Sequence, residues 1–129
     1  MKVSEVARKV PWTTPTTKVR EAAKLMEEAE VPCVMVKTVD GEFVGIFCRR
    51  ELVSAASEGR CEDAIEDYVN TEPSFVTYDA DVIDAIKLFN KYMEEELVVM
   101  NEKEEPYAVI TTIDVVRIAG KILESIYGE

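Results

Sequence analysis

The amino-acid sequence repeats itself once, and this repeat constrains the fold more than any other feature of the chain. The two halves agree without a gap at the one offset that places Glu51 opposite Asp114. The identical pairs are Val6 with Val69, Thr14 with Thr77, Val19 with Val82, Ala22 with Ala85, Leu25 with Leu88, Val36 with Val99, Val53 with Val116 and Ala56 with Ala119. We therefore interpret the 129 residues as two copies of one unit, residues 1–60 and residues 61–129.

Both copies show the same order of predicted elements. A short helical lead-in comes first, followed by an extended segment at Pro11–Thr17 in one copy and Thr71–Asp79 in the other. These segments resist helix formation because the residue before a proline is pushed toward extended conformations. Apolar residues at helical spacing then begin at Val19 and Val82, which predicts an amphipathic helix in each copy.

Two short strands and a last helix complete each copy. The apolar runs Cys33–Val36 and Leu97–Val99 are typical of buried strands. Asp40-Gly41 predicts a hairpin turn, whereas the corresponding turn at Asn101–Glu105 lacks glycine and is expected to be looser. Each copy thus reads α-β-α-β-β-α, which is too small to bury its own core. We predict an α/β (α+β) fold in which the two repeats pack through their sheets with pseudo-two-fold symmetry.

Composition excludes several classes of function. The net charge of −11 disfavours nucleic-acid and anionic-membrane binding. The chain has no histidine, which removes Ser-His-Asp and Cys-His catalysis. The amino-terminal residues lack the apolar region of a signal peptide, and no apolar run is long enough to span a bilayer. A soluble, cytoplasmic protein is expected.

The three cysteines, Cys33, Cys48 and Cys61, are widely spaced and form no C-x-x-C motif. Structural zinc sites use closely spaced thiols and histidines, so no metal site is expected. We expect buried or half-buried reduced thiols.

The order of these elements and their duplication resemble the CBS domain family, and in particular its tandem pair, called a Bateman module. The motifs are VPCVMV at residues 31–36 with GIFCRRE at 45–51, and LVV at 97–99 with AVITTID at 108–114. The resemblance covers nearly the whole chain. It implies regulatory binding of an adenosine-containing ligand (AMP, ADP, ATP or S-adenosylmethionine) in the cleft between the repeats, without a further cofactor.

The resemblance also implies which residues bind the ligand. Thr111 would contact a phosphate and Asp114 the ribose hydroxyls, while the segment from Ser74 to Thr77, centred on Val76, would line the base pocket. Thr112 belongs to the same motif. A protein partner would read the ligand state, and a homodimer is implied.

The first copy departs from the motif, because Cys48 replaces the hydroxyl residue and Glu51 replaces the aspartate. A thiol is a weak hydrogen-bond donor. We expect this site to be empty, weak or altered. Arg49 and Arg50 come directly after Cys48, and they either contact a phosphate bound by the second copy or lie in solvent. The same two alternatives apply to Arg117, which lies one turn after Asp114.

Other interpretations fit the same residues. Thr111-x-x-Asp114 is also an ordinary capping box at a helix start. If the motif is only a helix cap, the module is a scaffolding homodimer that binds no small molecule.

An enzyme would need Glu51 and Asp114 as acid and base, but no nucleophile, metal set or glycine-rich phosphate loop accompanies them. We expect no catalytic activity.

Overall fold

The computed structural model describes residues 1–128 and divides the chain into two compact units. One unit is Val10–Pro73, and the other joins Met1–Lys9 to the chain from Ser74 onward. The repeats of the sequence, predicted to meet after residue 60, are therefore divided differently from the compact units. Each unit takes the lead-in segment that the sequence places in the other repeat.

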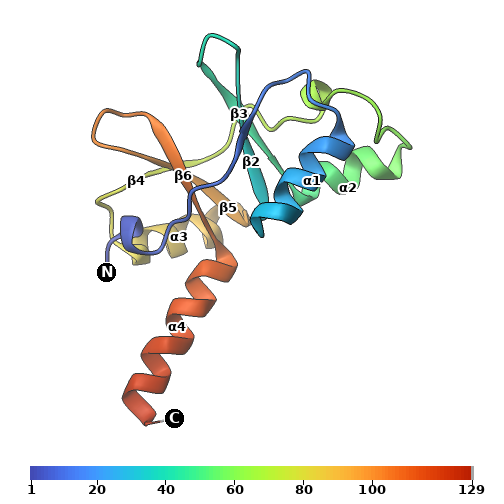
Figure 1. Ribbon diagram of the computed structural model, residues 1–129. Helices are drawn as coiled ribbons and strands as arrows, with labels where there is room; N and C mark the ends of the chain where they lie inside the picture. Colours follow the sequence, from blue (N-terminus) through green and yellow to red (C-terminus); the bar gives the residue numbers. More distant parts are fainter. Residues whose placement is uncertain (129) are drawn as a thin grey trace. The chain divides into compact units, whose positions relative to one another are not determined.

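The Val10–Pro73 unit contains a three-stranded sheet of order β1-β2-β3 (Figure 1). β1 pairs with β2 in parallel and β2 pairs with β3 in antiparallel. Its elements are β1 (Trp12–Thr13), α1 (Val19–Ala29), β2 (Cys33–Lys37), β3 (Phe43–Cys48), α2 (Arg49–Ser57) and the 3-10 turn η2 (Ile65–Asp67).

The second unit repeats this arrangement with the sheet order β4-β5-β6. β4 again pairs in parallel and β6 in antiparallel with the central strand. Its elements are the 3-10 turn η1 (Val3–Glu5), β4 (Phe75–Thr77), α3 (Val82–Tyr92), β5 (Glu96–Met100), β6 (Pro106–Thr111) and α4 (Thr112–Tyr127). The predicted order of elements is confirmed in both units, although the lead-in helices are single 3-10 turns.

The lead-in segments are integral parts of the cores that they join. Val3 is fully buried in the core of the second unit, and its N–H donates to the Ala80 carbonyl at 2.8 Å. Ile65 is fully buried in the core of the Val10–Pro73 unit, and its N–H donates to the Thr17 carbonyl at 2.8 Å. The short N-terminal turn lies beside α3 in Figure 1, where the Val82 N–H donates to the Met1 carbonyl.

The lead-ins also correct the ungapped comparison of the two halves. Val3 occupies the place of Ile65, and Val6 follows η1 as Tyr68 follows η2. The pair Val6 and Val69 is therefore wrong by one residue. From Trp12 onward the halves agree as predicted, because Trp12 pairs with Met35 as Phe75 pairs with Val98.

Gly45 allows the second lead-in to lie directly against β3. The backbones of Ile46 and Asn70 exchange two hydrogen bonds of 3.0 and 2.9 Å. A Cβ atom on Gly45 would lie 2.1 Å from the Asn70 carbonyl oxygen. The small residue at this position is thus explained by close packing of two backbone segments.

The turn at Asn101–Glu105 is better ordered than the sequence predicts. The Asn101 Oδ1 atom accepts hydrogen bonds from the N–H groups of Lys103 and Glu105, at 2.9 and 3.0 Å. Glu104 adopts a left-handed φ of 60°, the conformation expected of glycine. The asparagine side chain therefore organises the turn in place of a glycine.

Helix α4 continues well beyond the sheet of its own unit (Figure 1). Apolar side chains of this helix are exposed: 61% of Val116 and 53% of Leu123 are accessible to solvent. Among residues 1–128, none of the helices combines the length and the apolar character needed to cross a membrane.

Two of the cysteines form a disulfide, which corrects the prediction of reduced thiols. Cys33 on β2 and Cys48 at the end of β3 face each other in the antiparallel register and are bonded to each other. Their side chains are 0% and 1% exposed. Cys61 is free and exposed. Hairpin pairing brings together two thiols that are far apart in the sequence.

Reduction of this disulfide is expected to lower the free energy of unfolding. The bond closes a loop with a sequence separation of 15 residues. Chain-entropy arguments give about 3 kcal/mol for a loop of that size. Urea unfolding with and without a reductant measures the change in the Cys61→Ser variant, which cannot form other disulfides. Equal stability of the oxidised and reduced protein would contradict the prediction.

Candidate functional site

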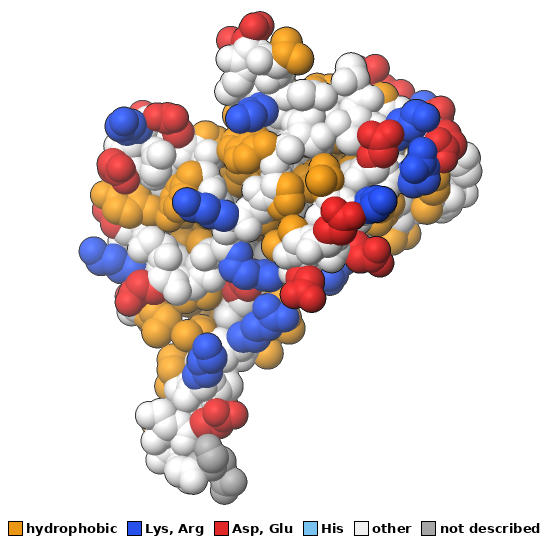
Figure 2. Space-filling view, in the orientation of Figure 1, with side chains coloured by type: hydrophobic (Ala, Val, Ile, Leu, Met, Phe, Trp, Pro, Cys, Tyr) orange, Lys and Arg blue, Asp and Glu red, His pale blue; other side chains and the backbone are white. Residues whose placement is uncertain are grey.

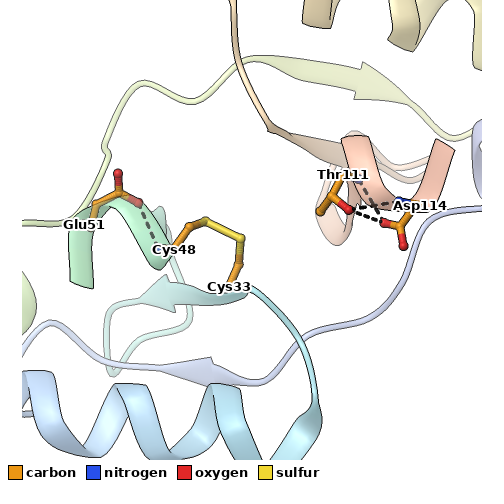
Figure 3. Close-up of a disulfide and its surroundings, with 5 residues drawn as sticks. All are labelled: Cys33, Cys48, Glu51, Thr111 and Asp114. Atoms are coloured by element: carbon orange, nitrogen blue, oxygen red, sulfur yellow. Dashed lines mark hydrogen bonds between the residues drawn. A yellow bond between two sulfur atoms is a disulfide. The ribbon is translucent and has the colours of Figure 1, made fainter. Parts of the chain in front are cut away.

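The predicted Thr111-x-x-Asp114 motif lies where β6 passes directly into α4 (Figure 3). Thr111 is the N-cap of the helix and Asp114 is its third residue. The Asp114 Oδ2 atom accepts hydrogen bonds from the backbone N–H and the hydroxyl of Thr111, both at 2.9 Å. In return, the Asp114 N–H donates to the Thr111 hydroxyl oxygen at 3.3 Å. The motif therefore forms a capping box, as one of the two interpretations predicted.

The other oxygen of Asp114 contacts a residue of the N-terminal segment. The Arg8 Nε atom lies 2.6 Å from Asp114 Oδ1. The Asp114 side chain is 3% exposed and that of Arg8 is 28% exposed. Arg8 is held in place by its backbone, because it exchanges two hydrogen bonds of 2.9 Å with Val109 on β6. The N-terminal segment thus supplies the cation for a carboxylate that is buried at the start of α4.

A pocket of about 190 Å³ opens beside this ion pair. It is lined by Glu5, Val6, Arg8, Asp114, Arg117, Ile118 and Lys121. Three of the lining residues are basic and two are acidic, in a chain whose net charge is −11. Arg117 and Lys121 follow Asp114 on successive turns of α4, so that one side of the helix faces the pocket.

The residues predicted to line a base pocket lie on or next to β4. Val76 is buried in the core of its unit, whereas Thr77 is exposed. The Ser74 hydroxyl donates to the Glu94 carboxylate at 2.7 Å, and the Ser74 carbonyl accepts from the Val98 N–H at 3.0 Å. The start of β4 and the end of β6 lie at the same end of the sheet, on either side of β5, because β5 is parallel to one and antiparallel to the other. Ser74 and Thr111 therefore lie at this end, while Thr112 is exposed in the first turn of α4.

The corresponding motif of the first repeat has a different chemistry. Cys48 is the N-cap of α2, and its N–H donates to the Glu51 carboxylate at 2.8 Å (Figure 3). The sulfur of Cys48 is bonded to Cys33, so it offers no thiol to a ligand. Arg49 and Arg50 are exposed on the first turn of α2. Their predicted contact with a phosphate stays a prediction.

Within residues 1–128, Glu51 forms no ion pair like that of Asp114 with Arg8. The place of Arg8 is taken by Asn70, whose side chain accepts a hydrogen bond from the Glu72 N–H. Burial is the largest influence on Glu51 and raises the pKa of its carboxyl above the ordinary value of 4.5. The hydrogen bond from Cys48 and the charge of Arg50 act in the opposite direction and do not compensate.

Sequence reasoning missed two of the residues around Asp114. Lys121 had a readable signal, because residues 114, 117 and 121 follow helical spacing. Arg8 had no such signal, since its place in the second unit depends on the exchange of lead-in segments.

The sequence matches the CBS domain family over residues 3–58 and again over residues 65–121. The chain belongs to this family and contains two CBS domains.

A curated protein of Acidianus ambivalens, described as an uncharacterized 17.7 kDa protein, is 29% identical over 117 residues, which cover 90% of this chain and 71% of the relative. Among solved structures, the CBS domain pair of protein MJ0100, in complex with 5′-methylthioadenosine and S-adenosyl-L-methionine, is 19% identical. Its TM-score is 0.79, with 92% of this chain and 98% of that chain covered. A CBS domain protein of Pyrobaculum aerophilum in complex with AMP is also 19% identical, with a TM-score of 0.79 and coverages of 88% and 89%. These structures share the fold of this chain.

Acidification is expected to stabilise the wild-type protein relative to a Glu51→Gln variant. Because the pKa of Glu51 is raised in the folded state, the folded protein binds this proton at a higher pH than the unfolded chain does. The free energy of unfolding of the wild type therefore rises relative to the variant as the pH falls through the folded pKa toward 4.5. Urea unfolding of both proteins between pH 7 and pH 4.5 measures the difference, and a constant or opposite difference would refute the prediction.

Proposed function

We propose that the protein is a non-catalytic sensor that binds an adenosine-containing ligand at the start of α4. The observation that carries the proposal is the Thr111–Asp114 motif, which lies at the same end of the sheet as Ser74 and next to a pocket. Both oxygens of the Asp114 carboxylate are bonded within the unit, so ribose hydroxyls would bind it by replacing the contact with Arg8. The backbone of the extended segment around Val76 would hold the base.

Solved structures with the same fold support this class of ligand. The CBS domain pair of MJ0100 is described in complex with 5′-methylthioadenosine and S-adenosylmethionine, and the Pyrobaculum protein in complex with AMP. The first-repeat motif is less suited to such a ligand, because its Cys48 sulfur is part of a disulfide. We therefore assign the ligand to the unit that contains Asp114.

Signalling would follow from a shift between conformations. A ligand changes an equilibrium only if it binds one conformation better than the other. The Arg8–Asp114 ion pair connects the N-terminal segment to α4, so a ligand at Asp114 would alter the position of both. A protein partner would read this change, and the net charge of −11 favours a partner with a basic surface.

The cytoplasm is the location that we propose, because adenosine nucleotides are metabolites of that compartment. Thiols are normally reduced there. The Cys33–Cys48 bond is fully buried, which shields it from soluble reductants.

A homodimer is proposed on a separate observation. Exposed apolar side chains follow α4 along its length, and 73% of Tyr127 is accessible. Others on α4 are Ile113, Val116, Ile122, Leu123 and Ile126, and on or next to α3 they are Ile83, Tyr92 and Met93. Large exposed apolar patches are normally covered by another protein surface. A second copy of the chain would cover these side chains. The second candidate function is a scaffolding homodimer that binds no small molecule.

Ligand binding is tested by thermal unfolding with adenosine, AMP, ADP, ATP and S-adenosylmethionine. A ligand at a hundred times its dissociation constant stabilises the native state by about 2.7 kcal/mol, which raises the midpoint by several degrees. We expect a shift with at least one of them, and its loss in Asp114→Asn. Glu51→Gln alters the matching residue of the other repeat and is expected to keep the shift. The absence of any shift in the wild type would favour the scaffold.

The dimer is tested by light scattering of the Val116→Asp, Leu123→Asp double variant. Two charges on the exposed apolar face are expected to convert the dimer to a monomer, because each charge would lose its hydration at the interface. Glu124→Gln lies on the same helix and is expected to leave the dimer intact. A monomeric wild type, or a double variant that remains dimeric, would exclude this interface.

A further inference from the structure

We propose that the Cys33–Cys48 disulfide is a redox switch, which a dithiol reduces in the folded protein and which sets how firmly the start of α2 is held. Both cysteines lie in the Val10–Pro73 unit. The proposed adenosine ligand is assigned to the other unit, so the switch does not depend on that ligand. It would give the first repeat, whose Cys48 sulfur is bonded to Cys33, an input of its own.

The disulfide lies at the open end of the β2–β3 hairpin. Cys33 is the first residue of β2 and Cys48 is the last residue of β3, so they form the pair of the register that is farthest from the turn. Beyond this pair, the Arg49 N–H donates to the Pro32 carbonyl at 3.2 Å. The end of a strand pair opens at a lower free energy than the middle of a sheet. The closed hairpin therefore buries the bond, and a local opening exposes it without unfolding of the unit.

Cys48 is the better leaving group of the two cysteines. It is the N-cap of α2, whereas Cys33 begins a strand. The free N–H groups and the dipole of a helix start stabilise a thiolate at that position. Arg49 and Arg50 add positive charge in the first turn, where Lys and Arg side chains also gather elsewhere on the surface (Figure 2). The Glu51 carboxylate opposes them, but it already accepts the Cys48 N–H at 2.8 Å.

Reduction proceeds by two thiol–disulfide exchanges with one dithiol. One thiolate of the dithiol attacks the Cys33 sulfur, so that a mixed disulfide forms at Cys33 and Cys48 leaves as a thiolate. The second thiolate of the reductant then attacks its partner sulfur in the mixed disulfide, and Cys33 leaves. The cysteines gain two electrons and two protons, which the dithiol loses as it becomes a cyclic disulfide. Oxidised glutathione reverses the reaction and is itself reduced to two thiols.

Reduction removes the covalent connection between β2 and the start of α2 (Figure 3). The hydrogen bond from Arg49 to Pro32 and the capping interaction between Cys48 and Glu51 then remain. α2 has only 9 residues. Isolated helices shorter than about 12–15 residues are marginal in water, so the position of α2 depends on such attachments. The reduced protein therefore keeps its sheet and holds the first turn of α2 less firmly.

The rate of reduction in the folded state tests the chemical step. The oxidised Cys61→Ser variant is incubated with dithiothreitol in dilute urea, below the unfolding transition, and its free thiols are counted by alkylation and mass spectrometry. We expect a rate that hardly changes with urea, because a local opening exposes little surface. Oxidised glutathione is expected to restore the bond. A rate that rises with urea as steeply as global unfolding, or no reduction of the folded protein, would overturn the inference.

Hydrogen exchange measures the structural consequence. We expect the amides of α2 to exchange at least about tenfold faster after reduction, with no dependence on dilute urea, which distinguishes local loosening from global unfolding. The amides of α3 in the other unit serve as the internal control and are expected to keep their rates.

Variants complete the test. Cys48→Ser keeps a favourable N-cap and is expected to exchange like the reduced protein, with or without dithiol. Cys33→Ser removes the same bond and replaces it if Cys48→Ser does not fold. The matched control Ser54→Ala lies on α2, keeps both cysteines and is expected to retain the difference between the two redox states. Equal exchange of α2 in the oxidised and reduced proteins would show that the bond is no switch and would overturn the inference.

Discussion

The ion pair between Arg8 and Asp114 connects the three parts of the second unit that define its candidate site. Asp114 begins α4, and Arg8 belongs to a segment that pairs with β6. An aspartate that is 3% exposed needs hydrogen bonds and a counter-charge, because an isolated buried carboxylate is strongly destabilising. Thr111 supplies the hydrogen bonds and Arg8 the charge. The site can therefore form only when the first nine residues of the chain are docked.

The two repeats differ in the residues at the start of their last helices, where the proposed ligand would bind. Asp114 has Arg8 and a hydroxyl N-cap, whereas Glu51 has Asn70 and a sulfur that is bonded to Cys33. The pKa of Glu51 is raised because burial outweighs the Cys48 hydrogen bond and the charge of Arg50. Both units have the same fold, and the second has Thr111 and Asp114 of the proposed ligand site where the first has Cys48 and Glu51.

Much of the fold follows from local sequence. The helices starting at Val19 and Val82 and the two hairpins were predictable, because apolar periodicity and turn residues act over a few positions. The exchange of lead-ins was not, since Val3 and Ile65 look alike as apolar residues of short helical turns. Within the candidate site, the Thr111-x-x-Asp114 motif was recognisable from its residue types and their spacing. Arg8 and the Cys33–Cys48 bond depend on tertiary pairing, which a single sequence does not encode at fixed spacing.

A double-mutant cycle on Arg8 and Asp114 tests most directly whether this ion pair holds the site together. The variants are Arg8→Gln, Asp114→Asn and their combination, with the free energy of unfolding measured in urea. We predict a coupling within about 0.5–3 kcal/mol, the range expected of residues in direct contact, and toward its upper end because Asp114 is buried. The same cycle on Arg60 and Asp63, an exposed pair in the other unit, should give a much smaller coupling. Additive effects at Arg8 and Asp114 would contradict the account, because the N-terminal segment would then be docked independently of the carboxylate.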